Sequence, residues 1–248
     1  MLKDKTAIIL GSARNMGRAF AEALARKGAN IVVHHHGASS SGDAATTAAA
    51  VERLGSKSVV VDGDIADGDV VRRIFARART EFGTVDVVIN CVGIVIKKPF
   101  VDYTEEDFDR SFATNARAAF LVMQEAARHI SDNGRIISIG TSLLGAYTGY
   151  YAVYAGSKAP LEDFTRALSK EIGSRGVTVN VVAPGPVDTA FFHGQETPEA
   201  VAYLSAASPA GRLGRIEDIV PMVEFLVSPA SQWVTGQTLF VNGGFVTR

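Results

Sequence analysis

The sequence predicts an α/β protein built on a doubly wound parallel sheet with helices on both faces. Short apolar, β-prone runs alternate with helical segments along most of the 248 residues. Four such runs, separated by helices, fall within the first ninety residues, a pattern typical of βαβ units. The length suits one large domain with a buried core, and no linker or internal repeat interrupts it. We therefore expect a single domain over 1–248 with about seven strands.

The expected strands are short runs rich in Val and Ile that end at glycine or polar residues. They cover residues 6–10, 29–33, 58–61, 85–89, 135–139, 177–182 and 238–241. The expected helices cover residues 18–27, 42–54, 67–82, 104–130, 154–172 and 216–226. Residues 190–208 break the alternation, with only a short helical stretch around 198–206. Because this insertion follows the carboxyl end of a strand, we expect it to form a substrate lid.

Composition excludes several classes of function. The net charge of −1 and the lack of a long basic run argue against a nucleic-acid or membrane surface. The single cysteine, Cys91, excludes an intrachain disulfide and fits a reducing cytoplasm. The first apolar run is too short, and too soon followed by Arg14 and Arg18, for a secretory signal or a membrane span. We expect a cytoplasmic protein.

A glycine turn links the first expected strand to the first expected helix. It reads Gly11-Ser12-Ala13-Arg14-Asn15-Met16-Gly17. Such a turn lets the backbone approach a pyrophosphate, which the helix N-terminus then stabilises. An ordinary tight turn is the alternative. Asn15 stands where a further glycine is expected, and Asn tolerates left-handed backbone angles better than most residues.

The end of the second strand bears on the choice of cofactor. An acid there would bind a ribose 2′-hydroxyl and repel a 2′-phosphate, but the chain reads His34-His35-His36-Gly37-Ala38-Ser39. Arg14, the histidines and the serines offer donors instead, so NADP(H) is favoured over NAD(H), with His35 and Ser39 as candidate contacts. Three consecutive histidines alternate sides in an extended segment and have no Cys or acidic partner nearby, so we expect no metal site.

Tyr154 and Lys158 form the strongest candidate for chemistry. Four residues apart on a helix, they project from one face a single turn apart. A lysine beside a tyrosine favours the phenolate, which predicts a lowered pKa for Tyr154 and a proton donor and acceptor usable near neutral pH. The pattern alone is common on helices. Thr141 and Ser142 follow a strand end, where open α/β sheets bind ligands.

Two further polar residues have two interpretations each. Asn115 lies close to an expected buried stripe formed by Phe108, Phe112, Ala119 and Met123. A polar amide there needs a partner, so it either joins two elements or holds water near a reaction site. Asp64, just beyond a strand, either contacts an adenine amino group or caps the next helix.

Five motifs occur in order along the chain. They are Gly11-xxx-Asn15-x-Gly17, Asn90-Cys91-Val92-Gly93, Asn115, Tyr154-xxx-Lys158, and Pro184-Gly185 followed by Thr189. With them the chain resembles the short-chain dehydrogenases/reductases over essentially its whole length, and is particularly similar to the β-ketoacyl carrier-protein reductase and polyhydroxynaphthalene reductase branches. The resemblance implies a Rossmann-type fold and an oxidoreductase that moves hydride between NADP(H) and a small carbonyl or secondary-alcohol substrate.

The resemblance also implies roles for individual residues. Tyr154 is the general acid, Lys158 holds the nicotinamide ribose and lowers the Tyr154 pKa, and Asn115 supports a proton-relay water. A hydroxyl after residue 139 holds the substrate oxygen; a gapless reading selects Thr141, and a shift of one residue selects Ser142. The cofactor residues it implies are Gly11, Arg14, Asn15, Met16 and Gly17 at the phosphates, Asp64 and Ile65 at the adenine, Asn90 and Gly93 near the adenosine ribose, and Pro184, Gly185, Val187 and Thr189 toward the carboxamide.

The resemblance leaves some questions open. Leu10 stands where the family usually has Thr, which removes one local hydrogen bond. An NAD(H)-dependent alcohol or sugar dehydrogenase and a non-catalytic cofactor-binding scaffold remain alternatives. The family implies a homo-oligomer, a tetramer or dimer, on helices where Ala116, Ala118 and Ala119 permit close packing. The substrate is not readable, although a partly aromatic pocket is suggested by Phe191, Phe192, His193, Tyr147, Tyr150 and Tyr151.

Overall fold

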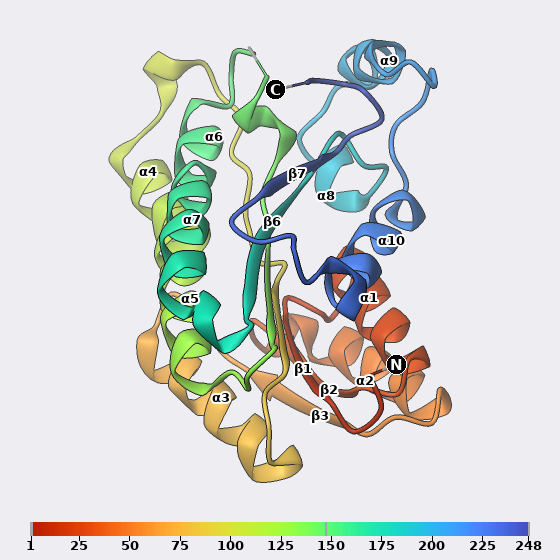
Figure 1. Ribbon diagram of the computed structural model, residues 1–248. Coiled ribbons are helices and arrows are strands. Elements are labelled where there is room, and N and C mark those ends of the chain that lie inside the picture. Colours follow the sequence, from red (N-terminus) through yellow and green to blue (C-terminus); the bar gives the residue numbers. More distant parts are fainter. Residues whose placement is uncertain (1, 147, 248) are drawn as a thin grey trace.

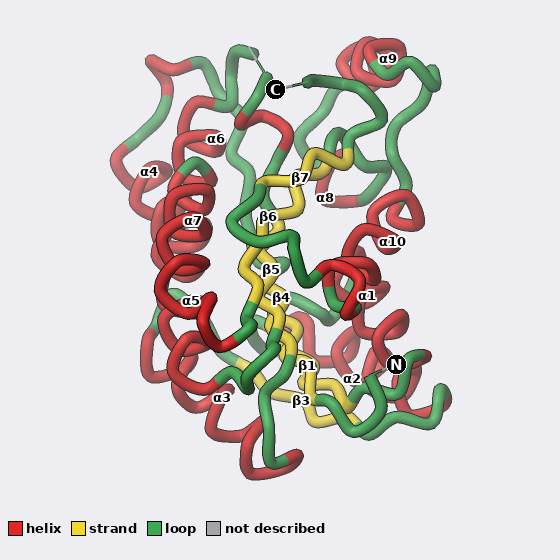
Figure 2. The backbone as a smooth tube through the Cα atoms, viewed as in Figure 1, coloured by secondary structure: helices red, strands yellow, loops and turns green. Residues whose placement is uncertain are grey.

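The computed structural model describes residues 2–146 and 148–247, and it contains one seven-stranded sheet in the order β3-β2-β1-β4-β5-β6-β7. All six pairings are parallel, and the sheet runs through the middle of the molecule (Figures 1 and 2). The predicted doubly wound parallel sheet of about seven strands is confirmed. The strands are β1 Thr6–Leu10, β2 Asn30–His35, β3 Ser58–Asp62, β4 Val87–Asn90, β5 Arg135–Ile139, β6 Thr178–Pro184 and β7 Thr238–Val241.

Helices cover both faces of the sheet. Helices α1, α2 and α10 pack together on one face, and α3, α5 and α7 pack together on the other (Figure 1). Their bounds, with those of the remaining α-helices, are α1 Asn15–Arg26, α2 Ser41–Arg53, α3 Gly68–Phe82, α4 Glu105–Phe112, α5 Ala118–His129, α6 Ala152–Lys158, α7 Pro160–Ile172, α8 Ala190–His193, α9 Pro198–Ala207 and α10 Ile216–Leu226. No helix within the described residues is long and apolar enough to cross a membrane.

Strand β1 shows why the sheet is so apolar. All five of its residues are buried, with Ala7 and Ile9 in the core layer under α1 and Ile8 and Leu10 in the opposite layer. A parallel strand covered on both faces needs apolar side chains on both, so the sequence shows a continuous run and no alternation. Strand β1 is accordingly an interior strand, paired with β2 and β4, and the glycine turn begins at its carboxyl end.

The helix predicted over 104–130 differs from the structure. It is interrupted by a π-helical turn, Ala113–Arg117, between α4 and α5. Phe108, predicted to be buried, is 48% exposed and stacks on Phe112, while Ala119 and Met123 are buried as expected. A π turn inserts one residue into the α-helical repeat, so a stripe extrapolated across it at 3.6 residues per turn moves to another face. The prediction for Phe108 was wrong for this reason.

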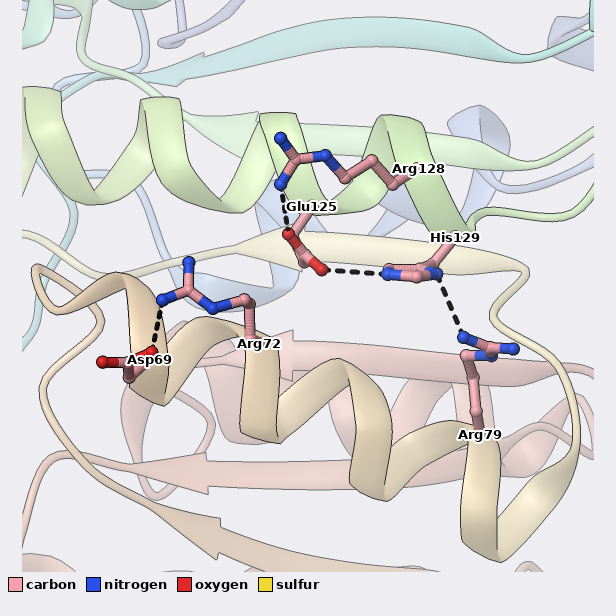
Figure 3. A network of polar contacts seen from close by, with 6 residues as sticks. All are labelled: Asp69, Arg72, Arg79, Glu125, Arg128 and His129. Carbon is pink, nitrogen blue, oxygen red and sulfur yellow. Dashed lines mark hydrogen bonds and ion pairs between the residues drawn. The ribbon is translucent and has the colours of Figure 1, made fainter.

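Polar contacts join α5 to α3 on one side of the molecule. Nη1 of Arg79, on α3, donates a hydrogen bond to Nδ1 of His129, on α5, at 3.2 Å. His129 Nε2 then donates to Glu125 at 2.9 Å, and Arg128 donates to the other carboxylate oxygen at 2.9 Å (Figure 3). Because Glu125 is buried, these donors satisfy a carboxylate that would otherwise be costly to bury.

Candidate active site

A cavity of about 810 Å³ lies at the carboxyl edge of the sheet, where parallel strands commonly bind ligands. Its walls come from the glycine turn, the segments that follow β4, β5 and β6, the start of α6, and the insertion 190–208. Most predicted site residues line it: Gly11, Arg14, Asn15, Met16, Gly17, His35, Asp64, Ile65, Gly93, Thr141, Ser142, Tyr154, Lys158, Pro184, Gly185, Val187 and Thr189. Three predicted residues, Ser39, Asn90 and Asn115, are not among its lining residues.

Tyr154 lies on α6 with its phenol buried in this cavity. Burial raises the pKa of Tyr154 to about 12, and a hydrogen bond from the Thr141 hydroxyl opposes that rise. The lowered pKa expected from Lys158 is therefore wrong for this structure, because loss of water around the phenolate outweighs the neighbouring groups. Tyr154 consequently remains protonated at neutral pH.

Lys158 is fully enclosed one turn further along α6. Its Nζ donates to the backbone carbonyls of Ile139 at 2.9 Å and Val92 at 3.3 Å. Burial lowers the pKa of Lys158 to about 8. A Cβ on Gly93 would lie 2.9 Å from this Nζ, so a larger residue at that position would displace the ammonium. Lys158 is thus held between the segments that follow β4 and β5.

The structure separates the two hydroxyls that the sequence left open. Ser142 is buried, and its Oγ donates to the Ala183 carbonyl of β6 at 3.0 Å. The Thr141 hydroxyl forms a hydrogen bond with Tyr154 and also accepts a hydrogen bond from the Leu143 amide at 3.3 Å. The geometry places Thr141 beside the phenol and gives Ser142 a contact within the sheet.

Asn115 lies in the π turn and joins three segments. Its Oδ1 accepts from the Ile94 amide, and its Nδ2 donates to the Ile94 carbonyl and to Ser157 Oγ, each at 2.9 Å. Both side-chain N–H groups are therefore used within the protein. Of the two interpretations left open, these contacts favour the structural amide that fixes the segment after β4 against α6.

The glycine turn has the geometry of an anion site. A Cβ on Gly17 would lie 2.3 Å from the Gly11 carbonyl oxygen, so only glycine lets α1 pack this closely on the turn. Asn15 takes the left-handed conformation predicted for it, with φ of 51°. No side chain caps the N-terminus of α1. The first amides of this helix are thus left for an anion, which fits the pyrophosphate of a dinucleotide.

His34 supports this turn, and the sequence reasoning missed it. Its Nδ1 accepts from the Gly11 amide at 3.1 Å, and its Nε2 lies 2.9 Å from the Gly63 carbonyl. These partners require the neutral tautomer with the proton on Nε2. Burial lowers the pKa of His34 to about 4. The alternation of side chains along β2 was the available signal, because it directs His34 to the same face as the buried Val32.

The end of β2 forms the rim of the cavity with Arg14, which lies 3.7 Å from Asp43 in an exposed ion pair. His35, His36 and Ser40 line the rim, whereas Ser39 is exposed and outside it. Ser39, predicted to contact the cofactor, is thus outside the lining, whereas Ser40, one residue on in the 3₁₀ turn Ala38–Ser40, is part of it.

Asn90, also outside the lining, supports the turn after β4. Its Oδ1 accepts from the Val92 amide at 3.1 Å. This bond fixes the turn that leads to Gly93, which lines the cavity, so Asn90 supports the cavity without lining it.

The insertion 190–208 forms part of the cavity wall. Of the aromatic residues suggested from the sequence, Phe191, Phe192 and Tyr151 line the cavity, whereas His193 and Tyr150 do not, and Tyr147 lies outside the described residues. The sequence reasoning missed Glu196, which also lines it and pairs with Lys97. Within residues 2–146 and 148–247, no group of three His, Cys, Asp or Glu side chains is placed to hold a metal ion.

The fold and this site together are those of an oxidoreductase that uses a dinucleotide. The family model described as enoyl-(acyl carrier protein) reductase matches residues 11–246. The chain belongs to the short-chain dehydrogenase/reductase family, as its motifs predicted.

Two relatives and one solved structure are similar to this chain over nearly its whole length. The chain is 36% identical to an NADPH-dependent aldehyde reductase-like protein, chloroplastic, of Arabidopsis thaliana, over 99% of this chain and 95% of that protein. It is also 36% identical to a hydroxynaphthalene reductase-like protein of Metarhizium brunneum, over 99% and 96% of the two chains. A putative dehydrogenase from Burkholderia cenocepacia with bound NADP superposes with a TM-score of 0.96 at 44% identity, covering 100% of this chain and 95% of that one.

Proposed function

We propose that the protein is an NADP(H)-dependent reductase that transfers hydride between the nicotinamide and a carbonyl or secondary alcohol. The observation that carries the proposal is the phenol of Tyr154, hydrogen-bonded by Thr141 and one turn from Lys158, inside a cavity that begins at an uncapped helix N-terminus. This arrangement supports a long cofactor along the sheet edge with its reactive end at the tyrosine.

When bound, NADPH would supply the hydride, and the protein would donate the proton. Tyr154, kept protonated by its raised pKa, donates to the carbonyl oxygen as negative charge develops there. The Thr141 hydroxyl, which donates to the phenol in the free protein, would turn its one O–H toward the same oxygen when a substrate is bound. Donors aimed at a developing alkoxide stabilise the transition state more than the ketone, so they accelerate the reaction. Lys158, one turn along α6 from Tyr154, would hold the nicotinamide ribose, as the family resemblance implies.

Donors at the rim support the choice of NADP(H). Arg14, His36 and Ser40 surround the end of β2, and no carboxylate closes that strand. An arginine in this place accommodates a 2′-phosphate, whereas an acid there would repel it. The bound NADP of the Burkholderia protein and the NADPH-dependent name of the Arabidopsis relative support the same choice.

The apolar side chains that line the cavity support a substrate with an apolar body. They include Val95, Leu143, Phe191, Phe192 and Leu204. Apolar walls bury apolar surface and leave recognition of the reacting oxygen to a few polar groups. Small aromatic or aliphatic aldehydes and ketones are the compounds to screen.

Assembly and location stay predictions. Ala116, Ala118 and Ala119, the small residues suited to helix packing between copies, are buried within this chain. These residues therefore pack in the core of this chain. The inference of a homo-oligomer, a dimer or a tetramer, rests on the family resemblance alone. The expected cytoplasmic location rests on the lone Cys91.

Tyr154→Phe tests the mechanism. Loss of a positioned general acid typically costs about 10²–10⁴-fold in rate, so we expect kcat to fall by that order while NADPH affinity stays within about twofold. NADPH oxidation measures turnover, and fluorescence titration measures binding. Tyr203→Phe, on the exposed part of α9, is the matched control and should behave like the wild type. Full turnover by Tyr154→Phe would contradict the mechanism.

A further inference from the structure

The carboxylate of Glu196 lines the cavity and is buried in an ion pair. Lys97, after β4, has its Nζ 2.5 Å from Oε2 of Glu196, in the insertion 190–208. Their side chains are 22% and 2% exposed, respectively. Burying a charge is costly unless it is paired and hydrogen-bonded. The enclosed carboxylate of Glu196 therefore depends on its charged and hydrogen-bonded partners to offset the cost of burial.

Tyr151 provides a second partner from a third segment. Its hydroxyl donates to Oε1 of Glu196, and the Lys97 ammonium lies 5.2 Å from the centre of its ring. Burial, together with the neighbouring carboxylate, raises the pKa of Tyr151, so it stays protonated as a donor. Segments following β4, β5 and β6 thus meet at one carboxylate.

Two of these three segments are already joined to each other. The Lys98 amide donates to the Tyr150 carbonyl at 3.0 Å, and the Tyr103 hydroxyl donates to the same oxygen at 2.8 Å. The insertion differs, because neither α8 nor α9 contains a buried residue. Few apolar contacts hold these helices, and such regions open at low free-energy cost. The contacts of Glu196 are therefore the strongest polar attachment of the insertion to the loops beside it.

We propose that Glu196 is a positioning residue that latches the insertion 190–208, through Lys97 and Tyr151, over the substrate half of the cavity. The proposal deepens the proposed function and rests on it for the substrate step. Glu196 and Tyr151 both line the cavity, and Tyr151 lies three residues before Tyr154. The latch holds Phe191 and Phe192 as a wall facing the reacting carbonyl.

Glu196→Gln, which keeps the shape and removes the charge, tests the latch. It leaves Lys97 enclosed without its anion, so backbone amides of 190–208 should exchange hydrogen about tenfold faster. The KM for a carbonyl substrate should rise about tenfold while kcat changes less than threefold, because uniform substrate binding is lost and chemistry is not. The Kd for NADPH should stay within about twofold, since neither Glu196 nor Lys97 is among the residues proposed to hold the cofactor.

Two further variants sharpen the test. Glu199→Gln, also in the insertion but exposed, is the matched control and should match the wild type in exchange and KM. Lys97→Met combined with Glu196→Gln removes both charges. It should recover part of the loss, because a neutral buried pair costs less than one unpaired charge.

Unchanged exchange and unchanged KM in Glu196→Gln would overturn the proposal. Exchange that rises equally throughout the protein would overturn it too, since that marks general destabilisation. A fall in kcat with constant KM would place Glu196 in the chemistry and also contradict it. The exchange measurement needs no substrate, so it tests the latch even if the wild type binds no NADPH and reduces no carbonyl, which would refute the proposed function.

Discussion

Tyr154 and Lys158 illustrate how burial sets the chemistry of single residues. The phenol has its pKa raised to about 12 and the ammonium has its pKa lowered to about 8, both chiefly by loss of water. Each shift disfavours the charged form of its own group. A neutral phenol is the form that can donate a proton to a carbonyl, so these shifts suit reduction at neutral pH.

Thr141 and Ser142 should give opposite phenotypes although they are neighbours. Thr141→Ala removes the donor beside Tyr154, and kcat should fall about 10²-fold, as for a lost donor to a developing oxyanion. Ser142→Ala removes the buried bond to Ala183, so the free energy of unfolding should fall by about 1 kcal/mol with kcat nearly unchanged. Steady-state kinetics and urea unfolding measure the two effects. The reverse pattern would assign the catalytic hydroxyl to Ser142.

His34 should make the fold sensitive to acid. Its folded-state pKa is about 4 against 6.5 for an unperturbed histidine, so between these values the unfolded chain binds the extra proton. Stability is then lost as the pH falls from 6.5 toward 4, by about 3 kcal/mol in total for this group. Urea unfolding across this pH range measures the loss.

Matched variants isolate the contribution of His34. His34→Asn keeps an acceptor for the Gly11 amide without titrating, so the acid-dependent loss should shrink. His36→Asn, at an exposed histidine on the same strand end, should leave the loss unchanged. An identical pH dependence in His34→Asn and the wild type would contradict the assignment.

At the scale of elements, the π turn Ala113–Arg117 matters most. It points the Asn115 side chain inward, where it forms hydrogen bonds with Ile94 and Ser157. It also changes which face of α4 is buried. Single-turn π segments often occur at functional sites. Here the turn connects the helix after β4 to the helix that carries Tyr154, so the position of the phenol depends on it.

The attachment of α5 to α3 gives a prediction at this scale. Glu125→Ala removes the acceptor of Arg128 and His129, and the free energy of unfolding should fall by about 1–2 kcal/mol because the lost bonds involve a buried charged group. Urea unfolding measures this. Glu81→Ala, which breaks an exposed ion pair with Arg77 on α3, should change the stability by less than about 0.5 kcal/mol. Equal losses in the two variants would contradict the role of Glu125.

At the scale of the whole molecule, one cavity links parts of the chain that are distant in sequence. The glycine turn after β1, the segments after β4 and β5, and the insertion after β6 all line it. Any ligand that fills it contacts most of the α/β units at once. Binding should therefore stabilise the fold as a whole.

Cofactor binding should raise the melting temperature in proportion to affinity. At 100 times its Kd, NADPH should add about 2.7 kcal/mol, or roughly 5–10 °C for a chain of this size. NADH at the same concentration should give a smaller shift, and Arg14→Ala should reduce the difference. Arg53→Ala, an exposed arginine of α2, is the control. Equal shifts with NADH and NADPH would contradict the assignment of the 2′-phosphate to Arg14 and its neighbours.

Local patterns in the sequence determined the sheet, its helices, the glycine turn and the Tyr154–Lys158 pair, because hydrophobic periodicity and a four-residue spacing act between near neighbours. Only the tertiary structure decided the rest. The raised pKa of Tyr154, the different contacts of Thr141 and Ser142, and the place of Ser40 in the rim depend on burial or on a shift of one residue. The contacts of His34 with Gly63, and of Glu196 with Lys97 and Tyr151, join segments 29, 99 and 45 positions apart. No periodicity encodes such pairs, since folding brings them together through the order of strands in the sheet.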